Sequence, residues 1–176
     1  AAWKSEGAAA QAMLPLSALP AFTGVAPWYY EWLRHPAYDP WWQWADLSGK
    51  YDRVSAAVLN ISGWHDEMYG PPGATANFAG LVRARGGQAP DARTQVVVGP
   101  WTHGSDWERS RVGAREMGPA AIVDYDALVL DWLDRWVKET RNGVEQRAPV
   151  RLYEMGANRW RELTMWPPPA DRRTLY

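Results

Sequence analysis

The sequence of 176 residues contains no cysteine, which excludes disulfides, thiol catalysis and cysteine-ligated metals. It has no apolar run close to the roughly 20 residues of a membrane-spanning helix, and no charged leader followed by an apolar stretch. Its 19 basic and 20 acidic side chains leave a formal net charge of -1. This balance argues against a nucleic acid or a membrane surface as a partner recognised by charge. The compartment is undecided, with the cytoplasm as the default, and a homo-oligomer is left open.

The residues that are present fit an ordinary globular protein, with 47% hydrophobic and 22% charged side chains. Tryptophan is unusually frequent, with 13 residues, many of them between Trp28 and Trp44. Residues 1–24 predict a loop with one short helical turn. Residues 28–46, which Pro36 and Pro40 interrupt, predict short helices with a tryptophan-rich face. Such rings either line a pocket or pack under a lid or against a neighbouring domain.

The middle of the chain has the pattern of a strand, a helix and a second strand. Residues 54–61 are mostly apolar and precede Ser62 and Gly63, as expected for a strand buried on both faces. Apolar residues then recur at helical spacing over 74–82. Residues 94–98 are rich in β-branched side chains and predict a second strand, which Gly99-Pro100 is expected to stop. Short connections between these elements predict a parallel βαβ unit in an α/β protein.

The last third of the chain predicts one more helix and then a hairpin. Residues 124–141 carry an apolar stripe at helical spacing, and Asn142-Gly143 ends it. Residues 149–155 and 159–165 suggest two antiparallel strands joined by a turn. A domain boundary is expected near residues 142–149.

Two polar side chains follow the two predicted parallel strands. Asp66 lies in the loop after the first strand, and His103 lies in the loop after the second. Because the carboxyl ends of adjacent parallel strands meet at one rim of a sheet, these loops are expected to lie together. An acid and then a histidine form the second half of the Ser–Asp–His order of α/β-hydrolases. In such a triad the imidazole takes the proton of the serine and the carboxylate stabilises the imidazolium.

Other assignments of these residues are open at this point. Asp66 could instead cap the helix that follows it, and Asp52 and Asp106 are competing acids. A metal-dependent hydrolase using His65, Asp66 and His103 is a weaker alternative, because no helix carries paired histidines at ligand spacing. We expect no metal and no cofactor. A different class of protein, a non-catalytic aromatic-rich module that binds carbohydrates, would also explain the tryptophans.

The amino-acid sequences of the two loops resemble those of one family of serine hydrolases. Gly63-Trp64-His65-Asp66, followed by Val98-Gly99-Pro100-Trp101-Thr102-His103-Gly104, resembles the acid and histidine segments of the X-Pro dipeptidyl-peptidase / cocaine esterase family. Further segments resemble other parts of this family: the end of its helical cap (His35–Asp39 with Trp41-Trp42), the helix that completes its core (130–138), and the entry to its jelly-roll domain (149–156 with Trp160-Arg161). The resemblance covers residues 14 to 176.

The resemblance implies a function and a division into domains. Asp66 would be the triad acid, His103 the general base, and Met68 a side chain of the acyl pocket. The substrate would be a small ester, an amide or a short peptide, such as an acyl ester, an amino-acid ester or an X-Pro peptide. Residues 1–48 would end a helical cap, 49–143 would form the C-terminal part of a partial α/β-hydrolase core, and 144–176 would start a β jelly roll.

The chain departs from this family's pattern at the nucleophile. The family needs a serine in a Gly-x-Ser-x-x-Gly turn between a strand and a helix. None of the seven serines of the chain has glycine two positions before it. We therefore expect a fragment that carries two thirds of a triad, with the serine and the oxyanion-hole groups upstream of Ala1.

Overall fold

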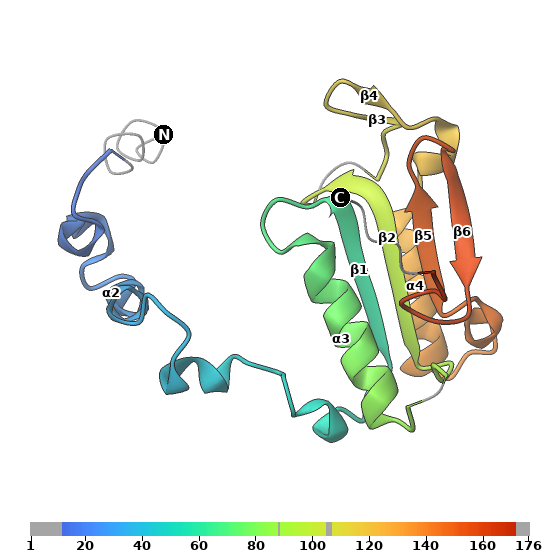
Figure 1. The fold of residues 1–176 in the computed structure, drawn as a ribbon, viewed down its shortest axis with the longest axis horizontal. Coiled ribbons are helices and arrows are strands. Elements are labelled where there is room, and N and C mark those ends of the chain that lie inside the picture. Colours follow the sequence, from blue (N-terminus) through green and yellow to red (C-terminus); the bar gives the residue numbers. More distant parts are fainter. Residues whose placement is uncertain (1–11, 88, 105–106, 172–176) are drawn as a thin grey trace. The chain divides into compact units, whose positions relative to one another are not determined.

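The computed structural model describes residues 12–87, 89–104 and 107–171. It divides into two compact units, Ala1–Leu47 and Ser48–Tyr176. The first unit consists of short helices and the second is built on a four-stranded sheet (Figure 1). The helices of the first unit are η1 (Leu16–Ala18), η2 (Pro20–Phe22), α2 (Pro27–Arg34) and η3 (Pro40–Trp44).

Local polar contacts hold the short helices of the first unit together. α2 begins at Pro27, which suits the first turn of a helix because that turn leaves its N–H groups unpaired. Asp39 caps η3 by accepting a hydrogen bond from the Trp41 backbone N–H at 2.8 Å. His35 Nδ1 lies 2.7 Å from Asp39 Oδ2, and its ring stacks on Trp41 with centroids 4.6 Å apart. The predicted short helices are confirmed, and His35 joins the end of α2 to η3.

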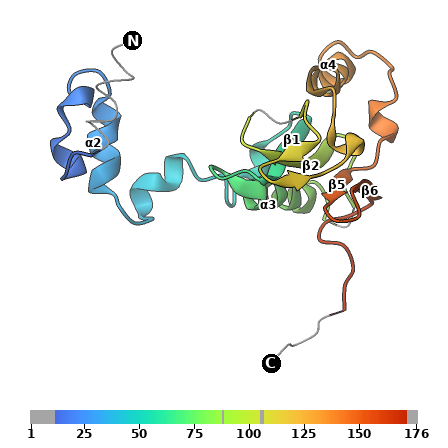
Figure 2. The same cartoon turned by 90° about the horizontal axis from the view of Figure 1, so that it is seen from above.

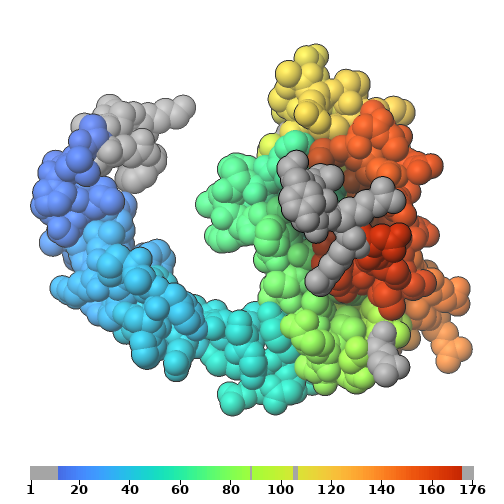
Figure 3. All heavy atoms as spheres, viewed as in Figure 1, coloured from blue at the N-terminus to red at the C-terminus, as the bar shows by residue number. Residues whose placement is uncertain are grey.

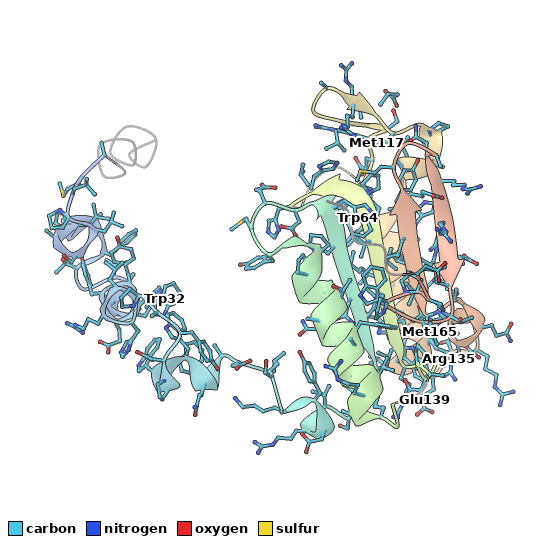
Figure 4. The ribbon with its side chains drawn as sticks, viewed as in Figure 1. Trp32, Trp64, Met117, Arg135, Glu139 and Met165 are labelled. Atoms are coloured by element: carbon cyan, nitrogen blue, oxygen red, sulfur yellow. The ribbon has the colours of Figure 1, made fainter. Side chains whose placement is uncertain are left out.

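The first unit buries none of its described aromatic side chains fully and leaves several of them exposed. Among its described residues, Leu19 and Ala26 alone are buried. Trp28, Trp32 and Trp44 are all exposed, and Trp32 is labelled in Figure 4. These helices therefore form a tryptophan-rich surface and very little core of their own.

The second unit contains a sheet with the strand order β1-β2-β5-β6. Its strands are β1 (Val58–His65), β2 (Thr94–Thr102), β5 (Val150–Glu154) and β6 (Arg159–Leu163). β1, β2 and β5 are mutually parallel, and β6 is antiparallel to β5. The remaining elements are η4 (Tyr51–Arg53), α3 (Gly70–Ala84), the hairpin β3 (Arg111–Val112) and β4 (Arg115–Glu116), η5 (Pro119–Ala121), α4 (Tyr125–Trp136) and η6 (Val144–Gln146).

Helices flank both faces of this sheet, so the predicted α/β class and the βαβ unit β1-α3-β2 are confirmed. α3 lies against one face, and α4 lies on the opposite side (Figures 1 and 2). On the α3 face, a buried cluster joins that helix to β2 and β5. In the space-filling view, the green surface of α3 lies beside the orange and red surface of the C-terminal strands (Figure 3). The cluster consists of Phe78, Val96, Val98, Val150 and Leu152. None of the helices in the described ranges is long and apolar enough to cross a membrane.

The two parallel strands end later in the sequence than predicted. β1 begins at Val58 instead of Val54, because the carbonyls of Val54 and Ala56 accept hydrogen bonds from the Arg85 side chain and make no strand pair. β1 then continues through Gly63 to His65. β2 also continues to Thr102, past the glycine and proline at which we expected it to stop.

The last helix is shorter than predicted. α4 starts as expected, where the Asp124 side chain accepts from the Ala127 N–H, but it ends at Trp136 and not at Arg141. Glu139 adopts a left-handed conformation with φ of 59°, and the Thr140 N–H returns to the Asp134 carbonyl. These contacts close the helix before the glycine that had suggested its end.

The C-terminal hairpin belongs to the same sheet as the βαβ unit. The predicted strands are confirmed as β5 and β6, but β5 pairs with β2 and buries Val150 and Leu152 in the common core. The residues expected to start a jelly-roll domain therefore contribute two strands to the hydrolase-like sheet, as far as Leu163. A jelly-roll domain stays a prediction for this chain.

Arg85, at the end of α3, ties together the two segments that lead into the parallel strands. Its guanidinium donates to the carbonyls of Val54 and Ala56 before β1, and to Arg93 O and Thr94 Oγ1 at the start of β2. Its side chain is only 10% exposed. The planar five-donor group suits this site because it donates to four acceptors from two chain segments at once.

We therefore predict that Arg85→Ala lowers the free energy of unfolding by roughly 1.5–3 kcal/mol, because four backbone and hydroxyl acceptors lose a largely buried charged donor. Urea denaturation of the protein measures this change. Arg83→Ala, which removes an exposed arginine from the same helix, is the matched control and should cost no more than about 0.5 kcal/mol. Equal effects of the two substitutions would contradict the assigned role of Arg85.

Candidate active site

Asp66 and His103 meet at the carboxyl ends of β1 and β2. Each residue lies just beyond its strand, and the strands pair so that His65 lies opposite Thr102. His103 Nδ1 is 3.2 Å from Asp66 Oδ1. The proximity expected from the sequence is thus observed, and it follows from parallel pairing across a short βαβ connection.

The Asp66 carboxylate is held by its own loop as well as by His103. Its Oδ1 accepts hydrogen bonds from the backbone N–H groups of Met68 and Tyr69, both at 3.0 Å. The Ser62 hydroxyl lies 3.5 Å from its Oδ2. The side chain of Asp66 is only 9% exposed. The two alternatives for this residue are therefore not exclusive, since it orders the turn before α3 and also contacts the imidazole.

These contacts lower the pKa of Asp66 to about 2. The Tyr69 backbone N–H makes the largest contribution, burial opposes it, and His103 and the Met68 N–H lower the pKa further. Hydrogen bonds to the ionised form favour that form, so the carboxylate stays charged at neutral pH.

The ionised acid determines which nitrogen of His103 carries the proton. A carboxylate can only accept hydrogen bonds, so the imidazole donates from Nδ1 and leaves the Nε2 lone pair available. The His103 side chain is 38% exposed, and the edge of the Tyr69 ring contacts it with centroids 5.2 Å apart. The His103 backbone N–H lies 3.4 Å from Glu67 Oε2. His103 is thus oriented on one side and accessible on the other.

A depression of about 480 Å³ lies beside the pair and gives the site room for a small organic group. Aromatic side chains contribute to its wall: Tyr69 after β1, Trp107 after β2, and Tyr125 at the start of α4. The rings of Trp107 and Tyr125 stack with centroids 4.4 Å apart. Sequence reasoning did not identify these three residues. The signal that could have found Tyr69 and Trp107 is their position, three residues after the acid and four after the histidine.

The structure places the other candidate residues differently. Met68 contributes its backbone N–H to Asp66, but its side chain is 63% exposed and does not line the depression. Asp52 lies in η4 and lines a separate groove on α3. Asp106 lies outside the described residues.

No metal centre forms around the pair in the described part of the chain. In that part, no group of three or more His, Cys, Asp or Glu side chains could hold a metal ion, so His65 does not join Asp66 and His103 in such a site. Ser62 lines the depression, but it lies within β1 and its hydroxyl contacts the acid.

We predict that Asp66 remains ionised until the pH falls to about 2. Because its folded pKa is depressed, the unfolded chain takes up the proton first as the pH falls below about 4, and stability is lost. Asp66→Asn should therefore show a shallower loss of unfolding free energy between about pH 5 and pH 2. In a second variant, His103→Gln, carboxyl NMR should still find the Asp66 pKa below its usual value, since the Tyr69 and Met68 N–H groups remain. A return to the ordinary value would contradict this account.

Known proteins are similar to this chain in sequence. The profile of the X-Pro dipeptidyl-peptidase (S15) family matches residues 3–105. The chain is 27% identical over 180 aligned residues to cocaine esterase from Rhodococcus sp., covering all of this chain and 29% of that protein. It is 29% identical over 133 residues to a Mycobacterium bovis protein described as a serine esterase, covering 76% of this chain and 19% of that one. The chain thus spans less than a third of these relatives.

Solved structures share the fold. An aminopeptidase from a marine sediment Thaumarchaeota archaeon superposes with a TM-score of 0.60 at 23% identity, covering 88% of this chain and 25% of that one. An alpha-amino acid ester hydrolase superposes with a TM-score of 0.59 at 22% identity, covering 89% and 26%. The matched profile spans more than half of the sequence and includes both loops of the Asp66–His103 pair. This chain belongs to the X-Pro dipeptidyl-peptidase (S15) family.

Proposed function

We propose that this chain provides the acid and the general base of a serine hydrolase that cleaves ester or amide bonds. The observation that carries the proposal is the 3.2 Å contact between Asp66 and His103, at the rim of a parallel sheet in an S15-family chain. An ionised, nearly buried acid behind a half-exposed imidazole is the arrangement that such catalysis requires.

In the proposed mechanism His103 Nε2 takes the proton of a serine hydroxyl as the serine oxygen attacks the substrate carbonyl. The imidazolium that forms carries its charge 3.2 Å from the Asp66 carboxylate, which stabilises it. His103 then returns the proton to the leaving group, and in the second half of the reaction it activates a water in the same way. Asp66 stays ionised throughout, in agreement with a pKa of about 2.

We further propose that the nucleophilic serine and the oxyanion-hole groups come from a segment outside these 176 residues. Two observations support this. No serine of the chain stands in a Gly-x-Ser-x-x-Gly turn, and the Ser62 hydroxyl faces the acid instead of the base. The reading frame that contains this chain should therefore encode such a turn. A complete reading frame without one would refute the assignment to serine hydrolases.

The proposed substrates are small acyl esters, amino-acid esters or short peptides with proline in the second position. Relatives and structural neighbours that are named as a cocaine esterase, an alpha-amino acid ester hydrolase and an aminopeptidase support this range. The aromatic wall formed by Tyr69, Trp107 and Tyr125 suits an apolar group of the substrate. We expect Met68 to contribute little to this pocket, because its side chain points into solvent.

The roles of the pair can be tested in the full-length protein with a chromogenic ester. We predict that His103→Ala abolishes measurable hydrolysis, because the serine loses its base, and that Asp66→Asn lowers kcat about 10⁴-fold. Asp52→Asn is the matched control, since it neutralises the other acid proposed from the sequence, and it should retain activity. Circular dichroism checks that each variant is folded. Retained activity in a folded His103→Ala variant would show that the base lies elsewhere.

We also predict that the 176-residue chain expressed alone hydrolyses no ester, because it supplies a base without a nucleophile. Burst kinetics with an activated ester would reveal even one turnover of an acyl-enzyme. A stoichiometric burst that disappears in Ser62→Ala would instead identify Ser62 as the nucleophile.

A further inference from the structure

The pairing of β1 and β2 is interrupted by one extra residue just before the site. The strands pair in regular register from Val58 with Thr94 up to Gly63 with Gly99. The next pair is His65 with Thr102. β1 thus advances two residues while β2 advances three, which is a β-bulge in a parallel pair.

The extra residue changes which residue, at the end of β2 or just beyond it, comes level with Asp66. Successive side chains of a strand point to opposite faces, so a slip of one residue exchanges the two faces. In a regular ladder His65 would pair with Trp101, and Thr102 would come level with Asp66. With the bulge, His65 pairs with Thr102 and His103 comes level with Asp66. The contact between acid and imidazole therefore depends on the bulge.

Gly63 and Gly99 make room for the bulge. A Cβ at Gly63 would overlap the backbone carbonyl of Trp101, and a Cβ at Gly99 would overlap the Trp101 ring. Pro100, between Gly99 and Trp101, has no N–H group that would need a partner, and proline is tolerated within strands mainly at bulges and edges. The Gly99-Pro100 pair, which suggested the end of a strand, is therefore part of the bulge.

Trp101 anchors the bulge to elements that follow the site in sequence. Its side chain is fully buried, and its indole N–H donates to the Ala121 carbonyl in η5 at 3.1 Å. Its ring contacts Trp107, whose centroid is 5.5 Å away, and Trp160 of β6, whose centroid is 5.7 Å away. Trp101 is thus fixed from three sides, and His103 follows it by only two residues.

We propose that the Gly63–Trp101 bulge is a positioning device that sets His103 against Asp66, with Trp101 and Gly63 as positioning residues. This inference rests on the proposed function for its catalytic consequence, but the alignment of the imidazole can be tested without any turnover. Bulges that re-aim a side chain are found beside active sites in other proteins.

The experiment uses two variants and one control in the full-length protein. Trp101→Phe keeps an aromatic ring but removes the N–H bond to Ala121, and Gly63→Ala places a methyl group against the Trp101 carbonyl. Trp132→Phe is the matched control, since Trp132 is also buried but lies on α4. The first readout is the proton NMR signal of His103 Nδ1–H, assigned by its loss in His103→Gln. The second readout is kcat and KM for ester hydrolysis.

We expect both bulge variants to lose or strongly shift the Nδ1–H signal, and kcat to fall about 10²-fold with KM changed less than about threefold, because misplacement by about 1 Å has that cost. Trp132→Phe should keep the signal and the kcat. If Gly63→Ala does not fold, Trp101→Phe alone decides the question. An unchanged Nδ1–H signal in folded Trp101→Phe would overturn the proposal. Activity that survives His103→Ala would refute the proposed function instead, and the NMR result would still stand.

Discussion

The parallel pairing of β1 with β2 is the constraint on which the arrangement of this chain depends. It brings the carboxyl ends of two strands, separated by the helix α3, to one rim of the sheet. Arg85 fixes the opposite ends of the same strands, where its guanidinium binds the carbonyls before β1 and the start of β2. Between these two ends, Phe78 packs on Val96 and Val98 and holds the helix to the sheet. The position of the site therefore follows from the strand pairing and helix packing within one βαβ unit.

The polar contacts at the rim serve stability and chemistry together. Asp66 accepts hydrogen bonds from two backbone N–H groups of the turn that starts α3, as a structural cap would, and it also accepts a hydrogen bond from His103 Nδ1–H. The same contacts that order the turn keep the carboxylate charged. A group that is rigid and ionised before substrate binds needs no reorganisation during the reaction.

Elements that follow His103 in the sequence, β5 and η5, bind the ends of the two strands that carry the site. The Tyr153 hydroxyl donates to the Met117 carbonyl, and the indole of Trp64, near the end of β1, donates to the Tyr153 carbonyl at 2.8 Å. Trp64 and Met117 are labelled in Figure 4. The Trp64 bond thus ties the end of β1 to β5, and the Trp101 indole ties the end of β2 to η5. The C-terminal hairpin thus extends the core sheet, although its alternating pattern had suggested a separate domain.

The sequence by itself determined the α/β class, the βαβ unit, the family, and the proximity of Asp66 and His103. These depend on local apolar periodicity and on short motifs beside strand ends. The tertiary structure decided what depends on contacts between distant segments. β1 continues through Gly63 because Trp101 occupies the space that a side chain would need there. Met68 is exposed, and Tyr125 lines the depression at the site. The tertiary structure also joined β5 to β2, since strand partners are chosen by packing across the sheet and a strand's own pattern does not name its neighbour.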